Sequence, residues 1–401
     1  MWFSLKQRID DAGFNRRHCD ENKKEKLVLN YRLVTTDSEL AQVCQEASNA
    51  PWLALDTEFV RTRTYYPQLG LLQLYDGKQV SLIDPLLITD FSPFKALLTN
   101  PEQLKFLHAG SEDLEVFMHD FDCVPEPMID TQVVAAFLGY PISCGFASLV
   151  AEHLGIELDK SESRTDWLAR PLSEKQCDYA AADVLYLLPL AEILMGKVTE
   201  AGYLEDAKDE CQRVVARRQK TLKPEKAYMN IHNAWQLRDE QLACLQLLAQ
   251  WRLNQAKARD MAVNFVVKEE HLWKVARYLP GSLGELDALG LTGQEIRCHG
   301  KRLLAIVEQA KQLDESQYPT PVANITEQSQ YKSVFKEIKA VVKDIAENEK
   351  FNAELLASRR QINQLLSIHW GLKSSATPPE LLAGWRGRLL AEPIAKLLAS
   401  V

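Results

Sequence analysis

Two carboxylates at the end of an apolar run are the residues of this chain best suited to chemistry. Asp56 and Glu58 follow the apolar residues 52–55 and are separated by a single residue. Because side chains alternate along a strand, a strand over residues 52–60 would place both carboxylates on one face. Neighbouring carboxylates are costly to bury unless a cation lies between them, and Mg²⁺ and Mn²⁺ prefer such oxygen ligands. The pair indicates a divalent-metal site, although two solvated acids at a strand end would show the same spacing.

Two later stretches offer further ligands. Asp113 lies near the start of a predicted helix whose next residues are largely apolar. Tyr179 and Asp183 are four residues apart in another predicted helix, so they share one face. The three alanines between them would let that helix approach a sheet closely. Alone, this pair would be interpreted as part of a helix surface, but together with the other acids it predicts a cluster of four carboxylates.

The elements that would position these residues form an α/β pattern. The predicted strands cover residues 52–60, 69–75, 79–83 and 105–108, and the predicted helices cover residues near 37–44, 93–98, 110–117, 131–138, 147–154 and 176–190. Asp76 and Gly77 are typical of a hairpin turn between two of the strands. Strands that come early, with helices between and after them, predict a mixed sheet flanked by helices.

The composition changes after Gly202, where helical spacing of apolar residues replaces strand patterns. We predict a flexible extension over residues 1–30, an α/β domain over 31–220, and two helical domains over 233–317 and 325–401. The first residues are polar and mixed in charge, without the apolar centre of a signal peptide. The basic residues of the segment 213–226 are interpreted as a solvated helix face rather than as an RNA contact.

Net charge, cysteine spacing and the length of apolar runs narrow the range of possible functions. The formal net charge of −8 over 401 residues argues against a generally basic coat that binds nucleic acid, but not against a local basic groove. The cysteines occur without a Cys-x-x-Cys pair, so neither a zinc site nor a disulfide framework is indicated, and a cytoplasmic location is expected. The longest apolar run, residues 184–195, contains Pro189 and Glu192 and is too short to span a bilayer, so no membrane partner is expected.

Asp56, Glu58, Asp113, Tyr179 and Asp183 together resemble the DEDDy group of 3′→5′ exonucleases. Longer stretches resemble the bacterial ribonuclease D family more closely; they are residues 56–70, 108–117 and 159–172. Motifs between residues 248 and 300 resemble an HRDC domain, the helicase-and-ribonuclease-D C-terminal module. Residues 356–362 and 385–386 resemble its degenerate second copy. The resemblance begins near residue 32 and continues to the C-terminus.

This resemblance implies a ribonuclease H-like α/β exonuclease domain followed by two all-α HRDC-type domains. It implies a hydrolase that uses two divalent ions, Mg²⁺ or Mn²⁺, and releases nucleoside 5′-monophosphates. Asp56 would bridge both ions, Glu58 and Asp183 would complete the tighter site, and Asp113 would hold the second ion largely through water. One ion would acidify the attacking water and the other would stabilise the departing 3′ oxygen. Tyr179 would orient the water, because a phenol is a poor base at neutral pH.

The expected substrate is RNA with a free 3′ end, in particular tRNA precursors and other small structured RNAs. The protein is expected to act as a monomer. Thr57 and Phe59 are candidates for contacts to the terminal ribose and base, and Arg61, Arg63 and Lys160 for contacts to phosphates. A DNA-directed 3′→5′ exonuclease is an alternative, since hydrolysis by two metal ions does not need a 2′-hydroxyl. A catalytically inactive nucleic-acid-binding protein is a second alternative, but such a protein need not retain mutually repelling acids.

Overall fold

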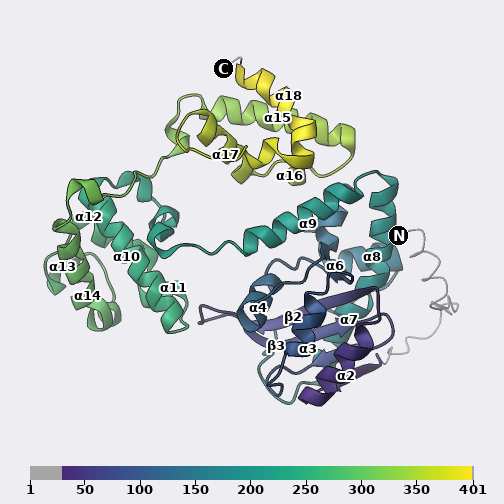
Figure 1. The fold of residues 1–401 in the computed structure, drawn as a ribbon. Coiled ribbons are helices and arrows are strands. Elements are labelled where there is room, and N and C mark those ends of the chain that lie inside the picture. The colour runs from purple at the N-terminus through teal and green to yellow at the C-terminus, as the bar shows by residue number, and fades with distance from the viewer. Residues whose placement is uncertain (1–28, 400–401) are drawn as a thin grey trace. The chain divides into compact units, whose positions relative to one another are not determined.

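A six-stranded mixed sheet forms the centre of the first domain (Figure 1). The computed structural model describes residues 29–399, so the predicted extension over residues 1–30 lies outside it except for its last two residues. The strands are β1 (Tyr31–Val34), β2 (Trp52–Val60), β3 (Gln68–Tyr75), β4 (Val80–Ile83), β5 (Leu104–Leu107) and β6 (Met128–Asp130), in the order β1-β4-β3-β2-β5-β6. β3 is antiparallel to β2 and β4, whereas the other neighbours are parallel. The predicted mixed sheet is confirmed, with β2 inside it.

Some helices lie between the strands in the sequence, and others follow the last strand. They are α2 (Asp37–Ala47), α3 (Ser92–Leu98), α4 (Asp113–Phe121), α5 (Thr131–Phe137), α6 (Phe146–Leu154), α7 (Glu174–Leu185), α8 (Leu187–Glu200) and α9 (Leu204–Arg218). α7 packs against β2, β3 and β4, and α8 packs against β2 and β5. The start of α2 is fixed by a capping box, in which Thr36 and Glu39 satisfy each other's backbone N–H groups.

Three local predictions needed correction. The short strands β1 and β6 were not predicted, because they contain only four and three residues and show little alternation. The helix predicted over residues 176–190 is two helices, α7 and α8, which meet at Tyr186. Together these two helices are long and apolar enough to qualify as a membrane span by length and composition. Their apolar residues are instead used in the domain core, where Val184, Leu190 and others are fully buried.

An arginine clamp fastens the segment before α7 to the sheet. The Arg170 guanidinium donates to both carboxylate oxygens of Asp84, at 2.6 and 2.7 Å, and to the Gly70 carbonyl at 2.6 Å. Trp167 lies directly on Gly70, where an added Cβ would come within 2.6 Å of the Trp167 carbonyl oxygen. A glycine is therefore needed in β3 at this point, and the clamp sets how closely the segment that leads into α7 can lie on the sheet.

Two helical domains follow, as predicted. The first contains α10 (Asp239–Ala258), α11 (Val263–Val266), α12 (Glu269–Tyr278), α13 (Leu283–Ala288) and α14 (Gly293–Lys311), and the second contains α15 (Tyr331–Glu349), α16 (Ala353–Leu356), α17 (Arg359–His369) and α18 (Gly384–Ala399). Short 3₁₀ turns lie before α10, between α14 and α15, and between α17 and α18; they are Pro224–Asn230, Ala234–Gln236, Glu315–Gln317, Ile325–Glu327 and Glu380–Leu382. Leu242, Leu245 and Leu248 of α10 are fully buried in the core of the first helical domain, as their spacing predicts.

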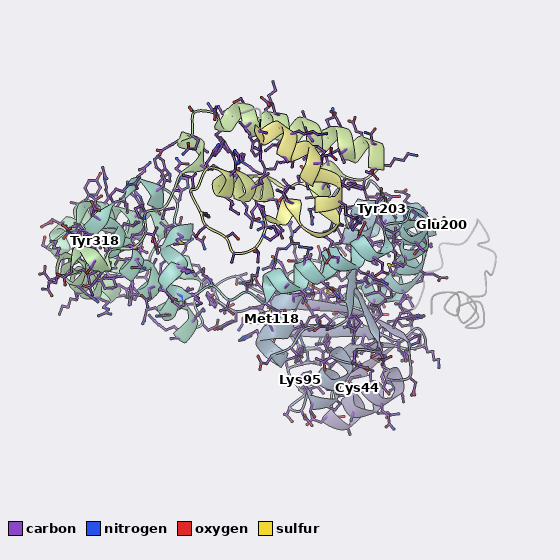
Figure 2. All side chains as sticks on the ribbon, turned by 45° about the horizontal axis from the view of Figure 1, so that its top comes forward. Cys44, Lys95, Met118, Glu200, Tyr203 and Tyr318 are labelled. Atoms are coloured by element: carbon purple, nitrogen blue, oxygen red, sulfur yellow. The ribbon has the colours of Figure 1, made fainter. Side chains whose placement is uncertain are left out.

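The second helical domain shares a buried aromatic cluster with the first, α/β domain. Tyr203, labelled in Figure 2, has its ring centroid 6.0 Å from that of Phe137 and 5.4 Å from that of Phe351. The ring centroids of Trp385 and Phe137 are 4.9 Å apart. Beside them Arg386 forms a buried ion pair with α9. The arginines of the basic segment 213–218 likewise pair with carboxylates of the protein, which does not favour the RNA contact for them.

Replacing Arg170 by methionine should destabilise the α/β domain. The Asp84 side chain is only 5% exposed, so the substitution leaves a buried carboxylate without its cation. We expect the free energy of unfolding, measured by urea denaturation, to fall by about 2–4 kcal/mol. Arg32→Met is the matched control, because Arg32 and Glu46 form an exposed pair and should contribute less than about 1 kcal/mol. Equal losses of unfolding free energy in the two variants would show that the Arg170–Asp84 contact does not stabilise the domain more than an exposed ion pair does.

Candidate active site

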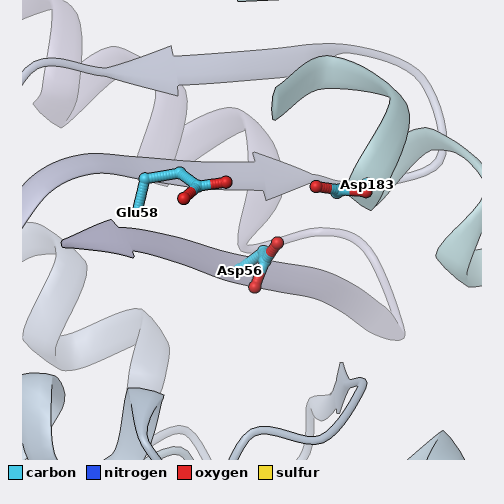
Figure 3. A group of neighbouring side chains, drawn as sticks. All are labelled: Asp56, Glu58 and Asp183. Carbon is cyan, nitrogen blue, oxygen red and sulfur yellow. The ribbon is translucent and has the colours of Figure 1, made fainter. Parts of the chain in front are cut away.

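Three carboxylates from two elements meet between β2 and α7 (Figure 3). Asp56 and Glu58 lie on the same face of β2, and Asp183 comes from α7. One carboxylate oxygen from each residue lies within 4.8 Å of the corresponding oxygens of the other two. The structure thus brings together three of the four acids singled out in the sequence, although Asp183 is more than a hundred residues away along the chain.

α7 reaches the sheet closely because its sheet-facing side chains are small. Ala180 and Ala181 are fully buried, as the predicted close approach requires. The helix begins with a capping box in which Ser173 and Gln176 satisfy each other's backbone N–H groups. From this fixed start, Asp183 lies in the third turn of α7, at the level of the carboxylates of β2.

The fourth acid, Asp113, lies outside this group of three. It is the first residue of α4, and the Thr57 hydroxyl donates a hydrogen bond to its carboxylate. The loop before α4 is held by Asp130, whose carboxylate accepts from the backbone N–H groups of Ala109 and Gly110 at 2.9 and 3.0 Å. Sequence reasoning missed this role of Asp130. Its place directly before a predicted helix, where capping acids are common, was the available signal.

Burial gives the four acids unusual proton affinities. It raises the pKa of Glu58 to about 9, of Asp183 to about 7 and of Asp113 to about 6. Burial and then repulsion by the neighbouring carboxylates hold the pKa of Asp56 well above its usual range. Without a cation the cluster therefore binds protons near neutral pH, and a divalent ion would replace them.

Tyr179 is one helical turn from Asp183 and is hydrogen-bonded to it. Burial, followed by the charge of Asp183, raises the pKa of the phenol well above its usual range. The phenol therefore stays protonated at neutral pH. A protonated phenol can donate a hydrogen bond and orient a neighbouring group, but it cannot act as a general base.

The donor set fits hard divalent cations. It offers only oxygen ligands, which are half-buried and repel one another until a cation is present. Directly opposite Asp56 in the sheet, the buried amide of Gln73 has no hydrogen-bond partner among the atoms of residues 29–399. Such an orphaned amide indicates that the protein atoms alone do not complete this site.

The five residues predicted to contact substrate differ in accessibility. The Thr57 side chain is buried and its hydroxyl donates to Asp113 of α4. The contact of Thr57 with the terminal ribose or base stays a prediction. Arg61 forms an ion pair with Glu115 of α4. Phe59 is half-buried, and Arg63 and Lys160 are exposed. These last three have side chains that remain available to an RNA strand.

Comparisons with known proteins agree with this geometry. The 3′-5′ exonuclease family matches residues 31–199, the HRDC domain family matches residues 241–307, and the ribonuclease D C-terminal HRDC domain matches residues 329–394. Ribonuclease D of Escherichia coli is 60% identical over 92% of this chain and 99% of its own length. Ribonuclease D of Haemophilus influenzae is 46% identical over 89% of this chain and 90% of its own length.

Solved structures give the same result. The crystal structure of E. coli RNase D, described as an exoribonuclease involved in structured RNA processing, superposes with a TM-score of 0.91 and covers 93% of this chain and 99% of its own. The catalytic core of RRP6 from Trypanosoma brucei has a TM-score of 0.58 at 22% identity and covers 71% of this chain and 81% of its own. The second likeness shows the shared fold alone.

Binding of Mn²⁺ to the metal-free protein should release protons at neutral pH. Glu58 is protonated below about pH 9 and Asp183 below about pH 7, and both must ionise to become ligands. We expect more than one proton to be released at pH 7 and fewer at pH 8.5, with Mn²⁺ affinity rising between these values. Calorimetric titrations in buffers of different ionisation enthalpy measure this release. Proton release that does not change with pH would show that the carboxylates are not the ligands.

Proposed function

Because the chain belongs to the ribonuclease D family of 3′→5′ exoribonucleases, we propose that it trims the 3′ ends of tRNA precursors and other small structured RNAs, releasing nucleoside 5′-monophosphates. The observation that carries this proposal is the half-buried cluster of Asp56, Glu58 and Asp183, with Asp113 and Tyr179 beside it. The description of the E. coli relative, which names structured RNA, supports the choice of substrate.

The four carboxylates are assigned to two divalent ions, Mg²⁺ or Mn²⁺. When bound, such a pair supplies an activated nucleophile and stabilises the charge on the departing oxygen. Asp56, on which the charges of all three other acids act, is assigned to both ions, and Glu58 and Asp183 to one of them. Asp113 is assigned to the other, and the Thr57 hydroxyl orients its carboxylate. Its position outside the group of three supports a looser hold on that ion.

Substrate contacts are assigned to the accessible residues around the carboxylates. Phe59 follows Glu58 on β2, where its half-buried ring can stack on the terminal base. Arg63 and Lys160 are exposed cations for the phosphates of the RNA strand. Arg61 can reach a phosphate only by exchanging its ion pair with Glu115.

We further propose that the chain acts as a monomer in the cytoplasm. Every acid assigned to catalysis comes from this one chain, so a second copy is not needed to complete the site. The cysteines between residues 44 and 298 are free thiols, which is typical of a reducing compartment.

The central test is cleavage of end-labelled RNA and DNA, each with a free or blocked 3′ end, in the presence of Mg²⁺, Mn²⁺ or a chelator. We expect 5′-monophosphates from RNA with a free 3′ end, and no product with chelator. Asp56→Ala, Asp113→Ala and Asp183→Ala should each abolish activity without loss of the fold, because removing one acid relieves repulsion. Glu102→Ala, which removes an exposed acid, is the control and should be fully active. Full activity of Asp56→Ala, or preferred cleavage of DNA, would overturn the proposal.

Tyr179→Phe should slow the chemical step and leave metal binding unchanged. The substitution keeps the ring and removes the protonated hydroxyl, to which we assign the orientation of the attacking water. Loss of one such hydrogen bond should lower the single-turnover rate by about 10²–10³-fold. Tyr186→Phe, at the end of the same helix, is the control. A rate within a few-fold of the parent, or a collapse of Mn²⁺ affinity, would show that Tyr179 has another role.

The helical domains are assigned to substrate capture. The first has a polar pocket of about 460 Å³ between α10 and α14. Its lining residues are Trp251, Gln255, Arg259, Cys298, His299 and Arg302. No carboxylate within residues 29–399 forms an ion pair with Arg259 or Arg302. Two cations beside an indole suit a phosphate and a stacked base of single-stranded RNA.

Reversing both pocket charges should weaken RNA capture and spare chemistry. Arg259→Glu/Arg302→Glu should raise the Kd for a long RNA by at least about tenfold, because two phosphate contacts become repulsive. Cleavage of a trinucleotide at saturation should not change, because the pocket contains none of the carboxylates assigned to catalysis. Lys301→Glu, which changes the charge of an exposed residue of α14 outside the pocket, is the control. An equal loss of RNA affinity in Lys301→Glu would show that the net charge of the protein, and not the pocket, determines the affinity.

A further inference from the structure

Gln73 is a buried amide whose polar atoms have no partner within residues 29–399. It lies in β3, and its exposed fraction is 0%. In this described part of the chain, neither its side-chain oxygen nor its side-chain nitrogen has a hydrogen-bond partner. An amide can donate two hydrogen bonds and accept two, and leaving these unmade in the interior costs stability. An apolar residue of similar size would fill this place at lower cost, so packing alone does not explain a glutamine here.

The sheet register places this amide beside the catalytic acids. Gln73 is directly opposite Asp56 in the antiparallel pair of β3 and β2. Directly opposite residues have their side chains on the same face, with Cβ atoms about 4.5–5.5 Å apart. That face is covered by α7, which carries Asp183 and packs against both strands. The amide therefore lies in the layer between sheet and helix that contains the carboxylates.

The other neighbour of Gln73 in the sheet is apolar. Across the β3–β4 pair it faces Leu82, which is fully buried. A second buried glutamine shows the contrast. Gln103, which is 1% exposed, donates from its side-chain nitrogen to the carbonyls of Ala47 and Ala50 at 2.8 and 2.7 Å. Gln103 thus has a structural role within the fold, whereas the polar residue directly opposite Gln73 in the sheet is Asp56.

We propose that Gln73 is a positioning residue of the metal site, whose amide donates to the Asp56 carboxylate when that carboxylate is ionised and holds divalent cations. An ionised carboxylate has about four lone-pair sites, so ligation of two cations leaves sites free for a donor. Ligating carboxylates are commonly oriented in this way by hydrogen bonds from neighbouring residues. The inference rests on the proposed function, because it assigns a new residue to the same metal site.

Gln73→Leu tests this role by readouts that do not depend on RNA cleavage. The substitution removes the amide and approximately keeps its volume. We expect calorimetric titration of Mn²⁺ into the metal-free protein to give an affinity about 10–100-fold below the parent. The Tm of the metal-free protein should stay the same or rise, because an unpaired polar group has been removed. The increase in Tm that Mn²⁺ produces should be smaller than in the parent.

Gln103→Leu is the matched control and should show the opposite pattern. It removes two buried hydrogen bonds far from the carboxylates, so the Tm should fall with and without Mn²⁺ while the Mn²⁺ affinity stays within about twofold of the parent. Gln73→Met repeats the test with a flexible side chain that adapts to the available space.

Two results would overturn the inference. One is an unchanged Mn²⁺ affinity in both Gln73 variants. The other is a lower Tm of both metal-free variants, which would show that the amide stabilises the fold itself. Failure of the parent protein to bind Mn²⁺ would be a different result, because it would remove the metal-dependent function and this inference with it. If the parent binds Mn²⁺ and cleaves RNA, and the Gln73 variants bind Mn²⁺ as tightly as the parent, only the role of Gln73 would be rejected.

Discussion

Four carboxylates in the exonuclease domain are held where burial raises the pKa of each. Repulsion between them adds to this for Asp56 and Glu58. Without bound metal this arrangement lowers the stability of the protein, because carboxylates so close together are stable only when they are protonated or when cations neutralise them. The remaining structure around the site can be understood as what is needed to hold these acids in place against that repulsion.

Several contacts provide this hold, and they come from different parts of the chain. Buried alanines let α7 lie close to the sheet, and Arg170 fixes the segment before it by binding Asp84 and the Gly70 carbonyl. Asp130 holds the loop that leads to Asp113, and the Thr57 hydroxyl orients that acid. Each contact is made by a group that is itself well packed or hydrogen-bonded. A site that must attract divalent cations is thus built on rigid elements, as accurate positioning of ligands requires.

The helical domains add charge and surface rather than further catalytic acids. Arginines of α9 are already paired with carboxylates, whereas Arg259 and Arg302 have no ion-pair partner within residues 29–399. The second helical domain also shares a buried aromatic cluster with the exonuclease domain, in which Trp385 packs against Phe137. Removing that domain would expose this cluster. Charge reversals in the first helical domain therefore separate substrate capture from folding better than a deletion does.

Local sequence was sufficient to find the fold class, the strand of Asp56 and Glu58, and the helical pair of Tyr179 and Asp183. These features depend on periodicities of two and 3.6 residues, which are visible within a short window. Only the tertiary structure decided which partner each side chain meets. It placed Gln73 opposite Asp56 and directed the Thr57 hydroxyl to Asp113. Such pairings depend on strand register and on contacts between distant segments, and a one-residue change of register would turn every side chain of a strand to the other face.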